Sequence, residues 1–213
     1  MDKEQKYHAE VDSGYEFGNT ALYLRVMNML QSSLLLVSNF SDDPLFRFAF
    51  TGPETNRHRG MEAYFSAALD YCLQEGSIII APENRGLLAW IPGSAFPPHI
   101  DQTRIRNQPS YVQEAWERLN NHESTPEAII AANANSFAYC WLLTVDFSVR
   151  GKGYGRMLME NGFDQMREAG LKECWLSTEN NCNNAFYELH GMELFESAAA
   201  SSGLTSYIFR KRL

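Results

Sequence analysis

Apolar residues recur along this chain with two different periods, and each change of period marks a change of element. Between residues 61 and 73 they return every three or four positions, which predicts an amphipathic helix that ends near Gly76. Two short β-rich runs follow, Ser77–Ala81 and Gly86–Ile91, separated by Pro-Glu-Asn-Arg. We expect a hairpin there, with a positive φ at Gly86 in the turn.

The first part of the chain divides into a polar start and an apolar stretch. Residues 1–14 are polar and mixed in charge, and they lack the features of a signal peptide. Residues Ala21–Phe40 are strongly apolar, but polar residues interrupt them too often for a bilayer span, so they predict a core helix. A short strand at Ala21–Leu24 stays open as an alternative start. The polar run Ser41–Pro44 then predicts a turn or a helix start.

The middle of the chain predicts an insertion between strands. Regular structure stops at Pro92–Pro98, and helices are expected at Ser110–Asn120 and Pro126–Asn133. The next strand begins near Phe137. This helical insertion, at about residues 92–136, is placed to cover a pocket, although simple packing and connection explain it equally well.

The second half of the chain alternates strands with helices. The apolar run Trp141–Val149 predicts a mostly buried strand, and helical spacing resumes at Met157 after three glycines. The later elements are a strand at Cys174–Leu176, a helix at roughly Asn183–His190, and strands at Met192–Ala198 and Leu204–Arg210. This order predicts an α/β (α+β) chain that folds as a single domain over residues 1–213, with a mixed central sheet flanked by helices.

Three glycines and three basic residues alternate between Arg150 and Arg156, directly before a helix. Glycines permit a sharp turn without a blocking Cβ, so several N–H groups can converge at the positive end of the helix dipole. Such a concavity suits a phosphate. The Walker string is absent, and the dinucleotide pattern fails because Arg156 follows Gly153 by three residues and Leu158 follows Gly155.

Two motifs nevertheless match one family in order and spacing. The first is Arg150-x-x-Gly153-x-Gly155 after a strand, and the second is Asn180, six residues, Tyr187, three residues, Gly191 and Met192. Together they resemble the signature of the GCN5-related N-acetyltransferase (GNAT) superfamily across the C-terminal half. The stretch NFSDDPLFRF, residues 39–48, also resembles the branch that includes puromycin acetyltransferase.

The resemblance implies a mostly antiparallel sheet whose fourth and fifth strands splay apart and expose backbone groups to the pantetheine arm of acetyl-CoA. Val145 and Phe147 would supply these main-chain groups, although family members often carry Pro at the position of Phe147. The loop Arg150–Arg156 would take the pyrophosphate. Asn180 would hydrogen-bond to pantetheine, cap the next helix, or do both. The expected coenzyme-binding residues are Val145, Asp146, Phe147, Arg150, Gly151, Lys152, Gly153, Tyr154, Gly155, Arg156 and Asn180.

The resemblance also implies a catalytic role for Tyr187. A phenol with an ordinary pKa of about 10 can protonate a departing thiolate within hydrogen-bond reach, whereas a core tyrosine on an amphipathic helix is the alternative. No general base is assigned, because Tyr139 stands where histone-acetylating relatives carry Glu. Glu179 and Asp146 are the nearest acidic candidates, and a water chain or a neutral amine would also suffice.

Composition narrows the class of function. With 213 residues, of which 45% are hydrophobic, the chain can bury a substantial core. A net charge of −8 disfavours a general nucleic-acid binder. The four cysteines form no CxxC pair, which predicts reduced thiols in the cytoplasm, and no metal-ligand cluster is visible.

These observations predict an acetyl-CoA-dependent N-acetyltransferase in which a primary amine attacks the thioester directly and Tyr187 is the general acid. Neither a nucleic-acid nor a membrane partner is expected. A small-molecule amine is favoured over a protein lysine, because Tyr139 departs from the histone-type pattern and the insertion can close over a pocket. A non-catalytic acyl-CoA-binding or sensing module stays open as an alternative, and so does a homodimer.

Overall fold

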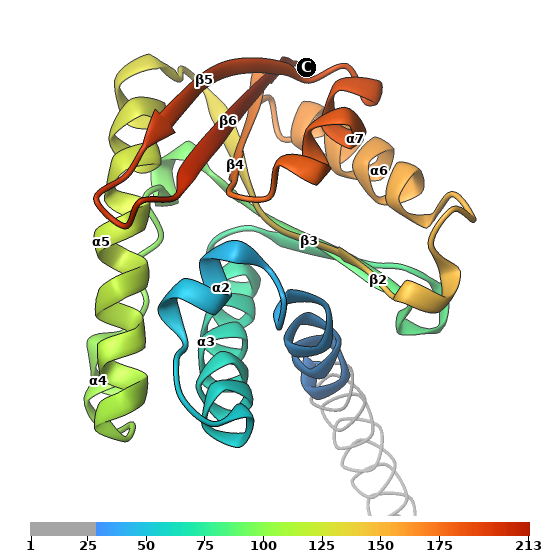
Figure 1. The fold of residues 1–213 in the computed structure, drawn as a ribbon. Coiled ribbons are helices and arrows are strands. Elements are labelled where there is room, and N and C mark those ends of the chain that lie inside the picture. The colour runs from blue at the N-terminus through green and yellow to red at the C-terminus, as the bar shows by residue number, and fades with distance from the viewer. Residues whose placement is uncertain (1–28) are drawn as a thin grey trace, which may run out of the picture.

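The computed structural model describes residues 29–213, in which helices pack on both faces of a central sheet (Figure 1). Residues 29–40 form a helix, as predicted; residues 1–14 and the alternative strand at Ala21–Leu24 lie outside the described part of the chain. The helices that follow are α2 (Pro44–Ala49), α3 (Glu54–Glu75), α4 (Gln102–Arg106), α5 (Ser110–Asn133), α6 (Tyr154–Glu168) and α7 (Asn184–Leu189). The strands are β1 (Ser77–Ile80), β2 (Gly86–Pro92), β3 (Phe137–Val145), β4 (Glu173–Thr178), β5 (Glu193–Ala199) and β6 (Thr205–Arg212).

The sheet has the strand order β1-β2-β3-β4-β6-β5. Its neighbours are antiparallel except for β3 and β4, which are parallel. A parallel pair needs a crossover connection, and α6 supplies it between these two strands. The prediction of a mixed, mostly antiparallel sheet flanked by helices is confirmed.

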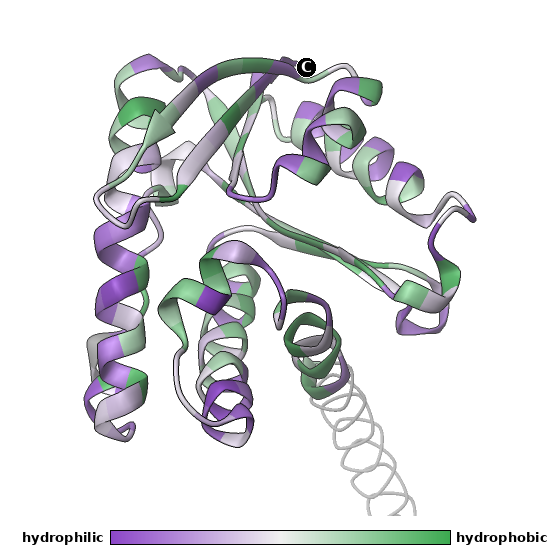
Figure 2. Ribbon diagram, in the orientation of Figure 1, coloured by the Kyte–Doolittle hydropathy of each residue, from purple (hydrophilic) through white to green (hydrophobic). Residues whose placement is uncertain are grey.

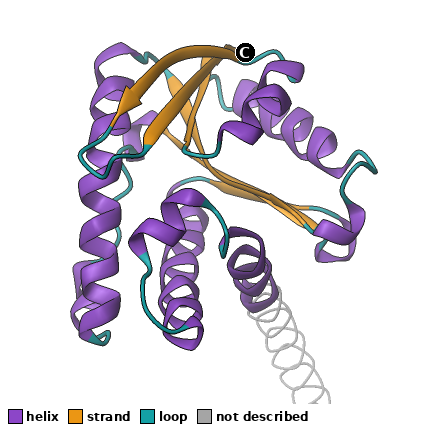
Figure 3. Ribbon diagram, viewed as in Figure 1, coloured by secondary structure: helices purple, strands orange, loops and turns teal. Residues whose placement is uncertain are grey.

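The parallel pair splays apart in the middle of the sheet. Residues Phe137–Tyr139 of β3 pair with Glu173–Trp175 of β4, and the pairing ends there. Beyond Tyr139, β3 continues along β2, while β4 continues along β6 to Thr178. Figures 1 and 3 show β2 and β3 running away from β4, β5 and β6. The two strands that separate are those before and after the glycine turn and its helix, as the family resemblance predicts, but they are the third and fourth strands of the described residues and not the fourth and fifth.

The two faces of the sheet bury two separate clusters of apolar side chains. Along β2, Leu87, Ala89 and Ile91 pack against α3 and α5, whereas Leu88 and Trp90 pack against α6 and its neighbours. This alternation follows from the two-residue period of a strand. Figure 2 shows apolar residues along β2 and β3 and polar residues on the outer sides of the helices.

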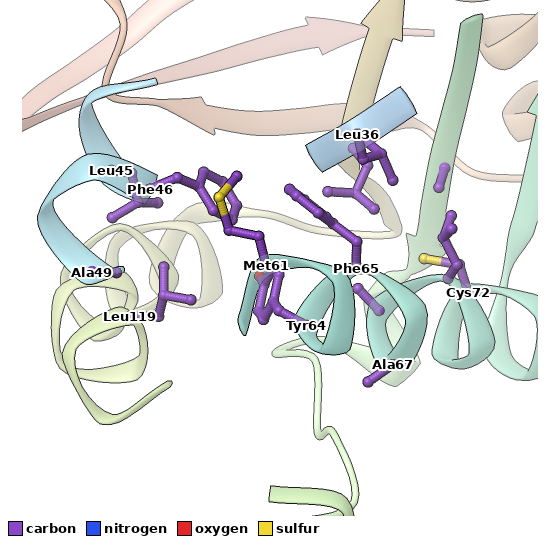
Figure 4. Packing of buried hydrophobic residues seen from close by; sticks show 14 of the residues in the cluster. Leu36, Leu45, Phe46, Ala49, Met61, Tyr64, Phe65, Ala67, Cys72 and Leu119 are labelled. Carbon is purple, nitrogen blue, oxygen red and sulfur yellow. The ribbon is translucent and has the colours of Figure 1, made fainter. Parts of the chain in front are cut away.

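The larger cluster joins the N-terminal helices to the sheet. Met61 and Phe65 of α3 point towards Leu36 and Phe46 (Figure 4). The rings of Phe46 and Phe65 stack with their centroids 4.8 Å apart. This aromatic contact fixes α2 and the segment before it against α3, and that segment reaches the functional site.

Helix α5 runs unbroken from Ser110 to Asn133, so the prediction of two separate helices is wrong. Proline lacks the N–H donor of a helix interior, yet Pro126 lies inside α5. The buried stripe continues across it, because His122, Pro126 and Ile130 are all buried at four-residue spacing. Packing of this stripe outweighs the local preference of proline for a helix start.

Two further predictions differ from the structure. The strand predicted at Trp141–Val149 ends at Val145, because Asp146 accepts a hydrogen bond from the backbone N–H of Ser148 and starts a 3₁₀ turn. In the hairpin, Glu83 and Asn84 have the positive φ values, not Gly86. Gly86 is needed for space instead, since a Cβ there would lie 2.7 Å from the carbonyl oxygen of Thr144.

Candidate functional site

A cleft of about 550 Å³ lies between the end of β3 and the start of α7, where β3 and β4 have separated. Four parts of the chain line it: Asn39, Phe40, Asp42 and Asp43 before α2; Leu143, Thr144, Val145, Phe147 and Val149 around the end of β3; Arg150, Gly151, Tyr154 and Gly155 in the glycine turn; and Asn180, Asn183, Phe186 and Tyr187. Arg150 and Gly155 of the first family-like motif and Asn180 and Tyr187 of the second therefore line one cleft.

The glycine turn has the geometry that its sequence predicts. Gly151 and Gly153 have φ values of 77° and 88°, a region that favours glycine. Gly153 is the N-cap of the fifteen-residue helix α6. Because the first backbone N–H groups of a helix have no intrahelical acceptor, those at the start of α6 are available to an anion. The turn can hold a pyrophosphate, and that role stays a prediction.

The basic residues of the turn occupy different positions. The Arg150 guanidinium lies 3.8 Å from the centre of the Phe147 ring, and both residues line the cleft. Arg156 donates from Nε to Glu160 Oε1 at 2.7 Å on the exposed side of α6. Lys152 is exposed and does not line the cleft. Arg150 is therefore the best placed of the three for contact with a bound phosphate.

The end of β3 holds three of the predicted coenzyme-binding residues. The Val145 carbonyl oxygen accepts a hydrogen bond from Asn39 Nδ2 at 3.2 Å, and the same amide nitrogen donates to Thr144 Oγ1 at 2.6 Å. Asn39 thus already engages one of the main-chain groups assigned to pantetheine. The Phe147 side chain is exposed, in the 3₁₀ turn that follows the strand.

Asp146 lies outside the cleft lining. Its carboxylate accepts from the Ser148 backbone N–H at 2.8 Å and from Arg85 at 2.9 Å. Hydrogen bonds from Ser148, and then from Arg85, lower the pKa of Asp146 to about 2. Such a weakly basic, engaged carboxylate is poorly suited to accept a proton from a substrate amine.

Asn180 and Tyr187 lie together on the opposite wall. The Asn180 side chain accepts a hydrogen bond from the Cys182 backbone N–H at 3.1 Å, so the capping role is observed while the residue also lines the cleft. Tyr187 is 8% exposed, and its ring contacts those of Phe186 and Phe209. Burial raises the pKa of the phenol well above its usual range. The hydroxyl therefore stays protonated at neutral pH, which an acid catalyst requires.

A second, smaller cavity of about 70 Å³ adjoins the cleft. Tyr187 and Asp43 line both spaces, and Glu123 and Glu179 also line the smaller one. Glu179 Oε1 lies 2.9 Å from His122 Nε2, and His122 Nδ1 lies 2.8 Å from Ser202 Oγ. Of the acidic candidates predicted from sequence, Glu179 thus reaches the site, but a buried histidine engages it.

Asp43 has a different environment. Its Oδ1 accepts from the Leu45 backbone N–H at 3.0 Å and caps α2, and within residues 29–213 it forms no ion pair. Burial, and then the nearby charge of Glu179, raise the pKa of Asp43 to about 6. At neutral pH Asp43 is a stronger proton acceptor than an ordinary aspartate, and it lies beside Tyr187.

Sequence reasoning missed the contributions of Asn39, Asp43 and Glu123. The polar run Ser41–Pro44 predicted a turn or a helix start, and α2 begins there with Asp43 as its N-cap, but a local capping signal does not show which part of the sheet the cap faces. Glu123 lies in a helix whose partner strands are far away in sequence. No motif could have placed Asn39 and Asp43 at the cleft or Glu123 at the smaller cavity, because the packing of the helix of residues 29–40, of α2 and of α5 on the sheet brings them there.

The sequence profile described as the acetyltransferase (GNAT) family matches residues 48–192, which is most of the chain. The chain belongs to the GNAT acetyltransferase family. The predictions of family, of acetyltransferase activity and of acetyl-CoA as co-substrate are thereby confirmed. A search of curated protein sequences gives no match. The narrower resemblance of residues 39–48 to the puromycin acetyltransferase branch stays a prediction.

Solved structures share the fold of this acetyltransferase at low sequence identity. The polyamine N-acetyltransferase of Drosophila melanogaster, which forms N-acetylagmatine, is 18% identical, with a TM-score of 0.58 over 88% of this chain and 96% of that one. An agmatine N-acetyltransferase variant in its apo form is 16% identical, with a TM-score of 0.55 over 86% and 94%. The mosquito protein "arylalkylamine N-acetyltransferase like 5b" is 13% identical, with a TM-score of 0.55 over 87% of this chain and 95% of that one. These similarities support the fold.

Among residues 29–213 of the acetyltransferase, no helix is both long and apolar enough to cross a bilayer. The same residues contain no group of three or more His, Cys, Asp or Glu side chains placed to hold a metal ion. The four cysteines are free thiols, and three of them are buried.

Proposed function

We propose that this acetyltransferase transfers the acetyl group of acetyl-CoA to the primary amine of a small molecule by direct attack. One observation carries the proposal: Tyr187 and Asp43 line both the cleft beside the glycine turn and the smaller cavity behind it. A coenzyme in the cleft and an amine in the cavity would therefore meet beside an acid and a base. The amine acceptors of the agmatine and polyamine enzymes that share the fold are consistent with this choice.

The chemistry assigns one proton transfer to each of these residues. The amine nitrogen attacks the thioester carbonyl carbon, so that a C–N bond forms and the C–S bond breaks. Asp43 accepts the proton that the amine loses, and Tyr187 gives its phenolic proton to the departing thiolate. Exchange with solvent then restores both groups. General acid and base catalysis of this kind typically contribute about 10²–10⁴-fold each.

The remaining coenzyme contacts follow from the position of the turn. The N–H groups at the start of α6 and the Arg150 side chain would hold the pyrophosphate. Asn180 and the backbone at Val145 and Phe147 would hold the pantetheine arm as the strands diverge. Because Asn39 already bonds to the Val145 carbonyl oxygen, we assign coenzyme binding there to the other main-chain groups exposed by the splay.

The proposal is tested by mixing the full chain with acetyl-CoA and single amines while free thiol and acetylated product are measured. The panel contains small monoamines, diamines, arylalkylamines and a lysine-containing peptide. We expect stoichiometric thiol and N-acetylated product with at least one small amine. Acetylation of the peptide alone would contradict the small-molecule acceptor, and coenzyme binding without turnover of any amine would indicate an acyl-CoA-binding module instead.

A further inference from the structure

A third cavity, of about 370 Å³, lies beyond the smaller one on the side of the helical insertion. Residues 97–100, which follow β2, and helices α4 and α5 form one side of it. Four aromatic residues line the cavity, namely Trp116 on α5 and Tyr64, Tyr139 and Trp141 on the other side. Its size is at the lower end of small-ligand pockets, which typically span about 300–1,000 Å³.

Two carboxyl groups line this aromatic cavity. Glu123 and Glu127 are one turn apart on α5, about 6 Å along the helix axis. Neither forms an ion pair or a hydrogen bond with another side chain of residues 29–213. Acidic side chains in such surroundings are normally paired, because an isolated charge is costly away from water. Burial raises the pKa of both carboxyl groups, so a cation bound beside them would favour their ionised forms. The cavity therefore offers two carboxyl groups that no ion pair within residues 29–213 engages.

The wall also keeps an unused buried donor. Trp116 is 3% exposed, and its indole N–H has no hydrogen-bond partner within the described residues. Buried polar groups are nearly always satisfied, by protein, water or ligand, so this donor indicates room in the wall for an acceptor such as water. An ammonium or guanidinium group cannot accept this hydrogen bond, and its attraction to the wall comes from the aromatic faces instead. Aromatic faces attract ammonium and guanidinium groups, most strongly where water is excluded. Aromatic walls together with unpaired carboxylates are thus suited to an organic cation.

The three spaces follow one another from the coenzyme to this cavity. Tyr187 and Asp43 are shared by the cleft and the small cavity, whereas Glu123 and Tyr139 are shared by the small cavity and the aromatic one. Glu127 lines only the aromatic cavity. An elongated acceptor with its reacting amine beside Asp43 would pass Glu123 and place its far end near Glu127.

We propose that the aromatic cavity binds the second, non-reacting cation of a linear diamine or amino-guanidine acceptor, with Glu127 as its counter-ion. This inference rests on the proposed function, because it names the acceptor class of the same site. Glu123, at the junction, would contact the chain near its reacting end. A monoamine of the same length leaves Glu127 without a partner and gains nothing from this part of the cavity.

The test compares 1,4-diaminobutane with butylamine in the enzyme of 213 residues. We expect kcat/KM to be at least about tenfold higher for the diamine, since a hydrogen-bonded ion pair out of water contributes on that scale. Glu127→Gln should reduce kcat/KM for the diamine by roughly tenfold and change that for butylamine by less than about twofold. Glu117→Gln is the matched control, because Glu117 is exposed on the same helix.

The outcomes separate this inference from the proposed function. If kcat/KM for butylamine or phenethylamine equals that for the diamine, or if Glu127→Gln keeps the diamine preference, the third cavity does not bind a second cation. The transferase assignment is unaffected by that result. If no amine releases thiol from acetyl-CoA that is bound, the proposed function itself is wrong, and the inference is overturned with it.

Discussion

Glu179 Oε1 lies 2.9 Å from His122 Nε2, and this contact joins the middle of α5 to the residue that follows β4. Both side chains are almost fully buried, with 0% of His122 and 6% of Glu179 exposed. Removing one member of a buried pair leaves the other buried without a partner, which typically lowers stability by about 3–5 kcal/mol. We expect His122→Ala to lower the free energy of unfolding by about this amount, measured by urea denaturation.

A matched control for this experiment is His58→Ala. His58 lies on the exposed side of α3, 3.8 Å from Glu54, and 43% of its side chain is accessible. A surface pair of this kind contributes about 0–1 kcal/mol. Equal losses for the two variants would show that the contact between α5 and the end of β4 does not hold the acceptor side of the site in place.

Tyr187→Phe tests the general acid. The substitution keeps the ring that packs against Phe186 and Phe209 and removes only the hydroxyl. We expect kcat to fall by roughly 10²-fold or more, with the affinity for acetyl-CoA nearly unchanged, because the proton is needed only as the thiolate departs. Steady-state kinetics and calorimetric titration measure the two quantities. The control is Tyr207→Phe, because Tyr207 lies on β6 and lines none of the three cavities; it should leave kcat and the affinity for acetyl-CoA unaltered. An unchanged kcat in Tyr187→Phe would show that Tyr187 is not the general acid.

The coenzyme side of the site could be predicted from sequence because its signals are local. A strand, a glycine turn and a helix start follow within twenty residues, and the positive φ values of Gly151 and Gly153 are those that such a turn needs. The position of Tyr187 follows from a short helix with fixed spacing to Asn180.

The acceptor side could not be predicted in this way. Asp43, Glu123 and Glu127 come from α2 and α5, and their meeting near Tyr187 depends on how these helices pack on the sheet. The unbroken course of α5 across Pro126 is itself a tertiary effect, whereas the two predicted helices would have left Glu123 in the connection between them and only Glu127 on a helix. Long-range packing therefore decides the part of the site to which we assign the acceptor.

Asp43→Asn should make the protein more stable and less active. The pKa of Asp43 is raised from 3.8 to about 6, so the ionised side chain destabilises the folded state. This penalty is fully present above about pH 6, decreases as the pH falls from about 6 towards 3.8, and is absent below that value. Asparagine keeps the cap of α2 without the charge. We expect about 1–3 kcal/mol of added stability at neutral pH, together with a kcat lower by roughly 10²-fold.

Denaturant unfolding at two pH values checks the stability part of this prediction. The difference between Asp43→Asn and the parent should be large near pH 7.5 and much smaller near about pH 4, where Asp43 of the parent is protonated in most folded molecules. Asp42→Asn is the control, because its neighbour Asp42 is exposed. A variant that is both more stable and fully active would exclude Asp43 as the proton acceptor.

Gly153→Ala separates backbone strain from coenzyme binding. Gly153 has a φ of 88°, and a Cβ there meets no protein atom within 4 Å, so only the backbone conformation resists the change. Gly170, at the other end of α6, has a φ of 79° and equally open surroundings. Both alanine variants should lose about 1 kcal/mol of stability. Only Gly153→Ala should also weaken acetyl-CoA binding, measured by calorimetry, and equal affinities would argue against the turn as the pyrophosphate site.

The diamine preference should depend on pH through Glu127. Burial raises the pKa of Glu127 to about 7, and the nearby His99 partly opposes this rise. The other titratable groups that line the cavity are Glu123, on the same helix, and the phenols of Tyr64 and Tyr139, which burial keeps neutral. An ionised Glu127 binds a cation better, so the diamine should lose affinity as the pH falls through about 7.

The ratio of kcat/KM for 1,4-diaminobutane to that for butylamine isolates this effect, because both substrates share the protonation of the reacting amine and of Asp43. We expect the ratio to fall by several-fold between about pH 8 and about pH 6 in the parent, and to stay flat in Glu127→Gln. If the ratio in the parent is independent of pH, a carboxyl group with a pKa near 7 does not contact the second cation. A pH-dependent ratio that persists in Glu127→Gln would assign the effect to Glu123 or His99 instead, because these are the other carboxyl and imidazole groups on the cavity wall.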